Sequence, residues 1–165
     1  IMVYSDILFE ENIMSQILAC QEDIVLIVDN TIQYHAPESN KVQDFVISKN
    51  KHQSTRRKIN FDCENIISKI GSNLKPETAT HEFIGLAKFS KNGAEQLLQT
   101  YEDCVKNYSG NLQEAANINQ FKFTDLIQEM IDRGYVANFL EIHKGWLEIH
   151  SSEDIKLANH FLSNS

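Results

Sequence analysis

The sequence of 165 residues has little of what divides, cross-links or anchors a chain. It contains only two prolines and six glycines, and no segment rich in either separates two domains, which predicts a single domain. No apolar run approaches the roughly 20 residues that a membrane-spanning helix needs. The N-terminus also lacks the basic region and small-residue cleavage site of a signal peptide.

Cysteine and histidine motifs are missing as well. The three cysteines, Cys20, Cys63 and Cys104, lie far apart, and none forms a CxxC pair. An odd number of separated cysteines predicts free thiols in a reducing compartment, so we expect a cytoplasmic protein. The six histidines show neither HExxH nor HxH spacing, which argues against a zinc site.

Positive charge is also scarce. The formal net charge is -8, which argues against binding to the phosphate backbone of nucleic acids. The apolar fraction of 42% and the charged fraction of 23% are ordinary for a soluble globular domain. A chain of this length can bury a sizeable core. We therefore expect neither nucleic acid nor a membrane among its partners.

The first 30 residues predict a strand, a helix and a second strand. Residues 1–5 form an apolar run, and a helical pattern begins near Glu11 or Asn12. Residues 24–28 form a continuous apolar run, which is typical of a parallel strand that is buried on both faces. Such a unit favours a right-handed crossover.

The remaining segments continue the alternation of strands and helices. Residues 31–78 are polar and alternating, which predicts a partly exposed antiparallel hairpin. Its basic run, Arg56 to Lys58, is either a solvated edge or a clamp on an anionic substrate. Further strands are expected at 82–90 and between 136 and 150, and helices near 91–109, 124–133 and 152–162. In the helix near 91–109 we expect an apolar face of Ala94, Leu97, Leu98, Tyr101 and Val105. The layout predicts one α/β domain with a central, mostly parallel sheet.

Two acidic residues stand at strand ends on opposite ends of the chain. Asp6 follows the first strand, and Glu148 lies in the last one, where it alternates with Trp146 and His150. Ligands of open α/β sheets bind at the carboxyl ends of strands. Mg²⁺ is held in proteins by one or two carboxylates, so Asp6 and Glu148 together would suit it. Spacing alone leaves two alternatives, a turn residue for Asp6 and a solvated side chain for Glu148.

Four stretches carry a resemblance to a known family. They are "VYSDILFEENIMSQILACQEDIVLIVD", "HEFIGLAKFSKNGAEQLL", "FTDLIQEMIDRG" and "GWLEIHSSEDIKLA". In this order they resemble nucleotidyltransferases of the sugar-1-phosphate and phosphocholine type. The likeness is strongest to the cytidylyltransferases of phosphonate biosynthesis, which are often fused to phosphoenolpyruvate mutase. It implies a three-layer, Rossmann-like fold and covers nearly the whole chain apart from the variable region 31–78.

The resemblance also implies a reaction and a set of site residues. A nucleotidyl group, CMP from CTP, passes to a small phosphonate or phosphorylated acceptor, and pyrophosphate leaves. Residues that match Asp6 and Glu148 bind Mg²⁺ in the family, and no further catalytic side chain is implied. The block that begins at Glu82 and includes Gly85 lines the acceptor pocket, and Lys88 would meet the negative charge of the acceptor.

The sequence departs from the family in two places. The glycine-rich nucleotide loop that opens these proteins is missing, so we expect residues 1–165 to be the C-terminal portion of one nucleotidyltransferase domain and to be inactive alone. Many relatives also carry an aspartate where this chain has His150, and histidine is a poor Mg²⁺ ligand. Glu148, with Asp154 as a candidate second acid, would then have to suffice.

Two other functions remain open at this stage. One is a sugar-1-phosphate nucleotidyltransferase, which performs the same chemistry on a hexose. The other is a catalytically degenerate binding module, which the missing loop and His150 would favour. A homodimer is also left open.

Overall fold

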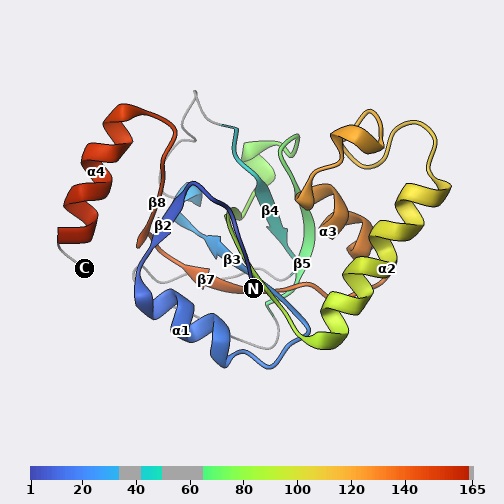
Figure 1. Ribbon diagram of the computed structural model, residues 1–165, viewed down its shortest axis with the longest axis horizontal. Helices are drawn as coiled ribbons and strands as arrows, with labels where there is room; N and C mark the ends of the chain where they lie inside the picture. Colours follow the sequence, from blue (N-terminus) through green and yellow to red (C-terminus); the bar gives the residue numbers. More distant parts are fainter. Residues whose placement is uncertain (34–41, 50–64, 164–165) are drawn as a thin grey trace.

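The computed structural model describes residues 1–33, 42–49 and 65–163 (Figure 1). Its helices and strands are, in chain order, β1 (Met2–Val3), β2 (Ile7–Phe9), α1 (Glu11–Ala19), β3 (Ile24–Asp29), η1 (Thr31–Gln33), β4 (Phe45–Ser48), β5 (Ile67–Gly71), η2 (Pro76–Thr78), β6 (His81–Phe89), α2 (Lys91–Asn107), η3 (Ile118–Gln120), α3 (Phe123–Asp132), β7 (Asn138–Ile142), β8 (Trp146–Glu148) and α4 (Ser152–Ser163). None of the described helices is long and apolar enough to cross a membrane.

The described strands form one main sheet and one small one. The main sheet has the order β5-β4-β6-β3-β7, and β1 pairs with β6 as well. Because Ala87 of β6 pairs with both Met2 and Leu26, β1 and β3 lie on opposite sides of β6. The small sheet consists of β2 and β8. β1 and β3 are therefore separated by β6, a strand that comes much later in the chain.

The α/β class is confirmed, and the central sheet is mixed, with β1, β3, β4 and β7 running in one direction and β5 and β6 in the other. Among the described pairings of the main sheet only β3 with β7 is parallel, and the others are antiparallel. The apolar run of β3 does lie in a strand that is buried throughout. Such a run reports that both faces of the sheet are covered, and this is equally true when a neighbouring strand is antiparallel.

Three layers result from the two faces of β3. Ile24, Leu26 and Val28 belong to a core cluster that includes residues of α3. Val25 and Ile27 belong to a second cluster that includes residues of α1. Figure 1 shows α1 on one side of the sheet and α2 with α3 on the other. Hydrophobic burial on both faces thus fixes β3 at the centre of the domain.

The helix α2 faces the core through a different stripe than its sequence predicts. Leu98, Tyr101 and Val105 are 58%, 47% and 48% exposed, whereas Thr100 and Cys104 are buried. The two stripes lie next to each other on the helix, so periodicity alone could not separate them. Small residues on the buried side allow α2 to approach its neighbours closely.

Parts of the region 31–78 follow the predicted hairpin. β4 and β5 pair in antiparallel fashion, but they belong to the main sheet, and Phe45 and Val46 are buried. The basic run Arg56 to Lys58 lies outside the described residues, as does Cys63. Cys20 and Cys104 are free, buried thiols, as predicted, and burial raises their pKa values.

Candidate active site

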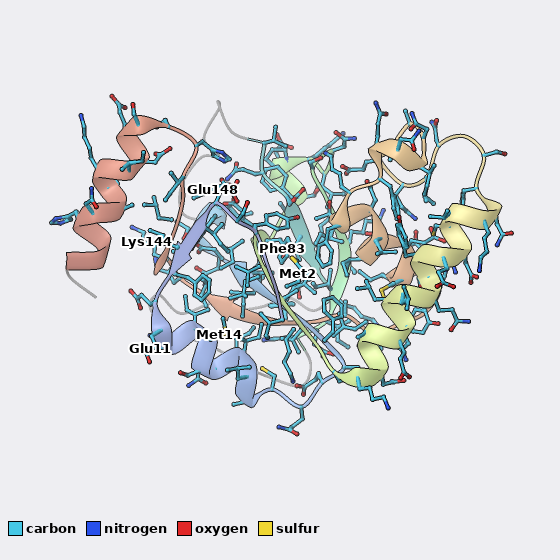
Figure 2. The ribbon with its side chains drawn as sticks, in the orientation of Figure 1. Met2, Glu11, Met14, Phe83, Lys144 and Glu148 are labelled. Atoms are coloured by element: carbon cyan, nitrogen blue, oxygen red, sulfur yellow. The ribbon has the colours of Figure 1, made fainter. Side chains whose placement is uncertain are left out.

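The ladder between β2 and β8 brings the two ends of the chain together. Ile7 lies opposite Glu148, and the backbone N–H of Ile149 donates to the carbonyl oxygen of Asp6 over 2.8 Å. Asp6 lies in the turn that precedes β2, and Glu148 is the last residue of β8. Figure 2 shows Glu148 above and to the left of Phe83 and well away from Glu11. Antiparallel pairing therefore places both acids at one end of the small sheet.

The side chains of Asp6, Glu148 and His150 converge at this end of the small sheet, which we call the β2/β8 rim. Asp6, Glu148 and His150 each offer one ligand atom, and these atoms all lie within 4.8 Å of one another. The imidazole Nε2 of His150 lies 2.8 Å from a carboxylate oxygen of Glu148. Among the described residues, none donates a hydrogen bond to the side chain of Asp6. Asp6 and Glu148 are partly buried, and His150 is exposed.

Negative charge accumulates around this group. The pKa of the Tyr4 hydroxyl is raised, first by burial and then by the charges of Asp44, Asp6 and Glu148. The pKa of Asp44 is raised to about 6 by burial, against the pull of Lys122, and the charge of Glu148 adds to it. Carboxylates that repel one another in a partly buried place are costly unless a cation neutralises them.

The arrangement of Asp6 and Glu148 fits a divalent cation. Around an octahedral ion with ligand distances of about 2.1 Å, neighbouring donor atoms lie about 3 Å apart and opposite ones about 4 Å apart. The separations of up to 4.8 Å between the three side chains need only small side-chain movements to reach this range. Oxygen donors from one or two carboxylates, with water and phosphate completing the shell, are what Mg²⁺ takes in proteins.

Hydrogen bonds from Trp146 and Lys144 to Asp29 hold β8 in place. The indole N–H of Trp146 donates to Asp29 over 2.6 Å, and the other oxygen of Asp29 accepts from the backbone N–H of Lys144. Gly145 has a φ of +84°, and a Cβ atom there would lie 3.1 Å from the carboxylate of Glu10. The lone tryptophan thus ties the β7–β8 turn to the end of β3, and Asp29 positions the strand that carries Glu148.

Asp154 stabilises the start of α4 next to this rim. Its carboxylate accepts hydrogen bonds from the backbone N–H groups of His150 and Ser151, over 3.0 and 2.8 Å. It therefore caps the start of α4, where a negative charge also suits the helix dipole. The same contacts hold the backbone of His150 in place next to Glu148.

The three residues predicted to bind the acceptor occupy different places along β6. Glu82 pairs with Asp29 at the end of β3, whereas Lys88 pairs with Val25 at its start. The ammonium group of Lys88 donates to the carbonyl oxygen of Cys20. Lys88 therefore lies at the end of β6 away from Glu82, and its role as a substrate ligand stays a prediction.

The backbone conformation and the close packing at position 85 both require a glycine. Its φ is +82°, and a Cβ atom there would lie 2.5 Å from the ring of Tyr4. The backbone N–H of Tyr4 also donates to the carbonyl oxygen of Gly85 over 2.9 Å. A glycine inside a strand often allows another group to approach the backbone closely, and here that group is the side chain of Tyr4, two residues before Asp6.

Sequence reasoning missed one member of this rim, His150, and one acid, Asp44, whose pKa the charge of Glu148 helps to raise. The only signal for His150 is its alternation with Glu148. Asp44 gives none, because its pKa depends on burial and on the charges of Lys122, Glu114 and Asp125, which are distant in sequence.

Solved structures share this fold. No protein-family model matches the chain, and no curated protein sequence does. The inositol-1-phosphate CTP transferase from T. maritima aligns with a TM-score of 0.58 and 17% identity, over 96% of this chain and 52% of that one. The nucleoside-diphosphate-sugar pyrophosphorylase from Vibrio cholerae aligns with a TM-score of 0.55 and 15% identity, over 96% and 53%. The chain spans about half the length of both structures, and the likeness shows that it shares their fold.

Proposed function

We propose that this chain is the metal- and acceptor-binding portion of an enzyme that transfers a nucleotidyl group from a nucleoside triphosphate to a phosphorylated acceptor. In its finer form the proposal names CTP as the donor and a small phosphonate or phosphate as the acceptor. The observation that carries it is the convergence of Asp6 and Glu148 in a fold that nucleotidyltransferases share. Without the fold, two neighbouring carboxylates would be too common to support it.

The chemistry needs little from side chains beyond position and charge. An acceptor oxygen forms a bond to the α-phosphorus while the bond from that phosphorus to the bridging oxygen breaks and pyrophosphate leaves. A phosphate or phosphonate oxygen is already anionic, so the attack requires no general base. Asp6 and Glu148 would hold Mg²⁺, which neutralises the charge of the triphosphate when bound.

The test is a measurement of pyrophosphate release. The 165-residue chain and the product of the whole gene are each incubated with the four nucleoside triphosphates, with and without Mg²⁺. A small phosphonate and a sugar 1-phosphate serve as acceptors. We expect release that depends on acceptor and Mg²⁺ in at least one of the two proteins, with CTP preferred. Absence of release from both proteins with every pair would leave a binding module as the function.

A sugar phosphate is the second candidate acceptor. The printed names of both similar structures favour it, since one is an inositol-1-phosphate CTP transferase and the other a nucleoside-diphosphate-sugar pyrophosphorylase. The two candidates are separated by the acceptor arm of the same experiment. Turnover with the sugar 1-phosphate and none with the phosphonate would replace the finer proposal and keep the broader one.

A further inference from the structure

His150 contributes a nitrogen atom to a rim that otherwise offers oxygen. Its Nε2 lies 2.8 Å from Glu148, and the ligand atoms of Asp6, Glu148 and His150 lie within 4.8 Å of one another. We propose that these three side chains form a mixed nitrogen and oxygen site that binds a divalent first-row transition ion in preference to Mg²⁺. This inference rests on the metal site of the proposed function and changes which ion occupies it.

The place of His150 is set by the fold. Its backbone N–H donates a hydrogen bond to the carboxylate of Asp154, which caps α4. The backbone N–H of the neighbouring Ile149 donates to the carbonyl oxygen of Asp6. Hydrogen bonds of residues 149 and 150 therefore fix the backbone that carries the imidazole. Its side chain is 45% exposed and that of Glu148 is 20% exposed, so an ion can reach them from solvent.

The donor set decides the preference. Mg²⁺ is a hard ion that takes oxygen ligands and keeps several waters. Imidazole suits the later divalent ions of the first transition row, and affinity for mixed sites rises from Mn²⁺ toward Cu²⁺. Two carboxylates and one imidazole accordingly favour an ion from the series that begins at Mn²⁺.

Electron paramagnetic resonance with Mn²⁺ tests the inference directly. The whole chain is titrated with Mn²⁺, and pulsed measurements record whether a ¹⁴N nucleus of an imidazole is coupled to the bound ion. Mg²⁺ is then used as a competitor. The variants are His150→Asp, Asp6→Asn and, as a matched control, His160→Gln, which removes an exposed histidine of α4. Circular dichroism verifies that each variant is folded.

We expect one bound Mn²⁺ with nitrogen coupling in the wild type and in His160→Gln. In His150→Asp the coupling should vanish, and the ratio of the Mg²⁺ to the Mn²⁺ dissociation constant should fall by about tenfold or more. In Asp6→Asn the binding of Mn²⁺ should weaken by more than about 100-fold, because a ligand itself is lost.

The outcomes separate this inference from the proposed function. Bound Mn²⁺ that depends on Asp6 but shows no nitrogen coupling would overturn the role of His150 and leave the oxygen site intact. Nitrogen-coupled Mn²⁺ without any nucleotidyl transfer would keep the inference and refute the proposed function. Mn²⁺ binding that is insensitive to Asp6→Asn and to His150→Asp would refute the site itself.

Discussion

Carboxylates in two regions of this molecule differ in what they contact. Around α3, the side chains of Glu114, Asp125 and Glu129 each accept at least two hydrogen bonds. At the β2/β8 rim, Glu148 pairs only with His150 among the described residues, and no described residue donates to the Asp6 side chain. Hydrogen-bonded carboxylates hold loops and helix ends in place, whereas the rim carboxylates repel one another. The difference teaches that acids of equal charge serve the fold in one region and are open to a ligand in the other.

Neutralising the rim should produce the largest change, and it should affect binding. Asp6→Asn and Glu148→Gln should each weaken divalent metal binding, and slow nucleotidyl transfer, by more than about 100-fold, because even residues that only support metal ligands cost 10–100-fold. Calorimetric titration measures the affinity. Asp6→Asn should not lower the free energy of unfolding, since it removes a like charge, and Glu148→Gln should lower it only through the weakened contact with His150. Glu102→Gln, on the exposed side of α2, is the control. A metal affinity of Asp6→Asn within threefold of the wild type would contradict the assignment of the rim acids to metal binding.

Neutralising an acid of α3 should instead affect folding. Glu129 accepts hydrogen bonds from Tyr108, Gln113 and Arg133 over 2.8 to 2.9 Å. Glu129→Gln should lower the free energy of unfolding by about 2–3 kcal/mol, as expected for hydrogen bonds to a buried charged group. Urea unfolding measures it, and metal affinity should stay unchanged. A loss of metal binding in the folded variant would show that the two regions are coupled.

The same variant carries a pH dependence of known sign. Burial would raise the pKa of Glu129, but the hydrogen bonds from Gln113, Arg133 and Tyr108 outweigh it and leave the pKa below its ordinary value of 4.5. The charge therefore stabilises the fold above pH 4.5, and this contribution is lost as the pH falls through the lowered pKa. The stability difference between the wild type and Glu129→Gln should be full at pH 7 and should shrink below pH 4.5.

Asp44 sharpens the comparison because it is a partly buried acid whose pKa the charge of Glu148 helps to raise. Its pKa is raised from 3.8 to about 6, mainly by burial. Between these two pH values the folded chain holds the proton more tightly than the unfolded chain, so stability falls as the pH rises through this window. Asp44→Asn should therefore raise the free energy of unfolding by about 1–2 kcal/mol at pH 7.5 and by much less at pH 4.5. An equal effect at both pH values would contradict the burial of the charge.

The smallest effect is expected at the other end of the sheet. Lys88→Gln should lower stability by at most about 1 kcal/mol, because it weakens one hydrogen bond to the carbonyl of Cys20. The KM for the acceptor should not change, since Lys88 lies away from the end of β6 that carries Glu82. A clear rise in KM with unchanged stability would restore Lys88 as a substrate ligand.

Local elements were predictable where a short pattern decides them. The strand β3, the start of α1 at Glu11 and the end of α3 before Gly134 agree with the sequence. The direction of the sheet was not predictable, because an apolar strand that is buried on both faces accepts neighbours of either direction. The buried face of α2 was also missed, since Leu98 and Cys104 lie on adjoining stripes of one helix.

The sequence by itself determined the α/β class and named Asp6 and Glu148, because burial patterns and acids at strand ends are local features of the chain. Only the tertiary structure decided that the two acids meet, that His150 joins them, and that the pKa of Asp44 is raised. The physical reason is that strand pairing joins segments from opposite ends of the chain, and the environment of a charge depends on every segment packed around it. No pattern within a single segment records either fact.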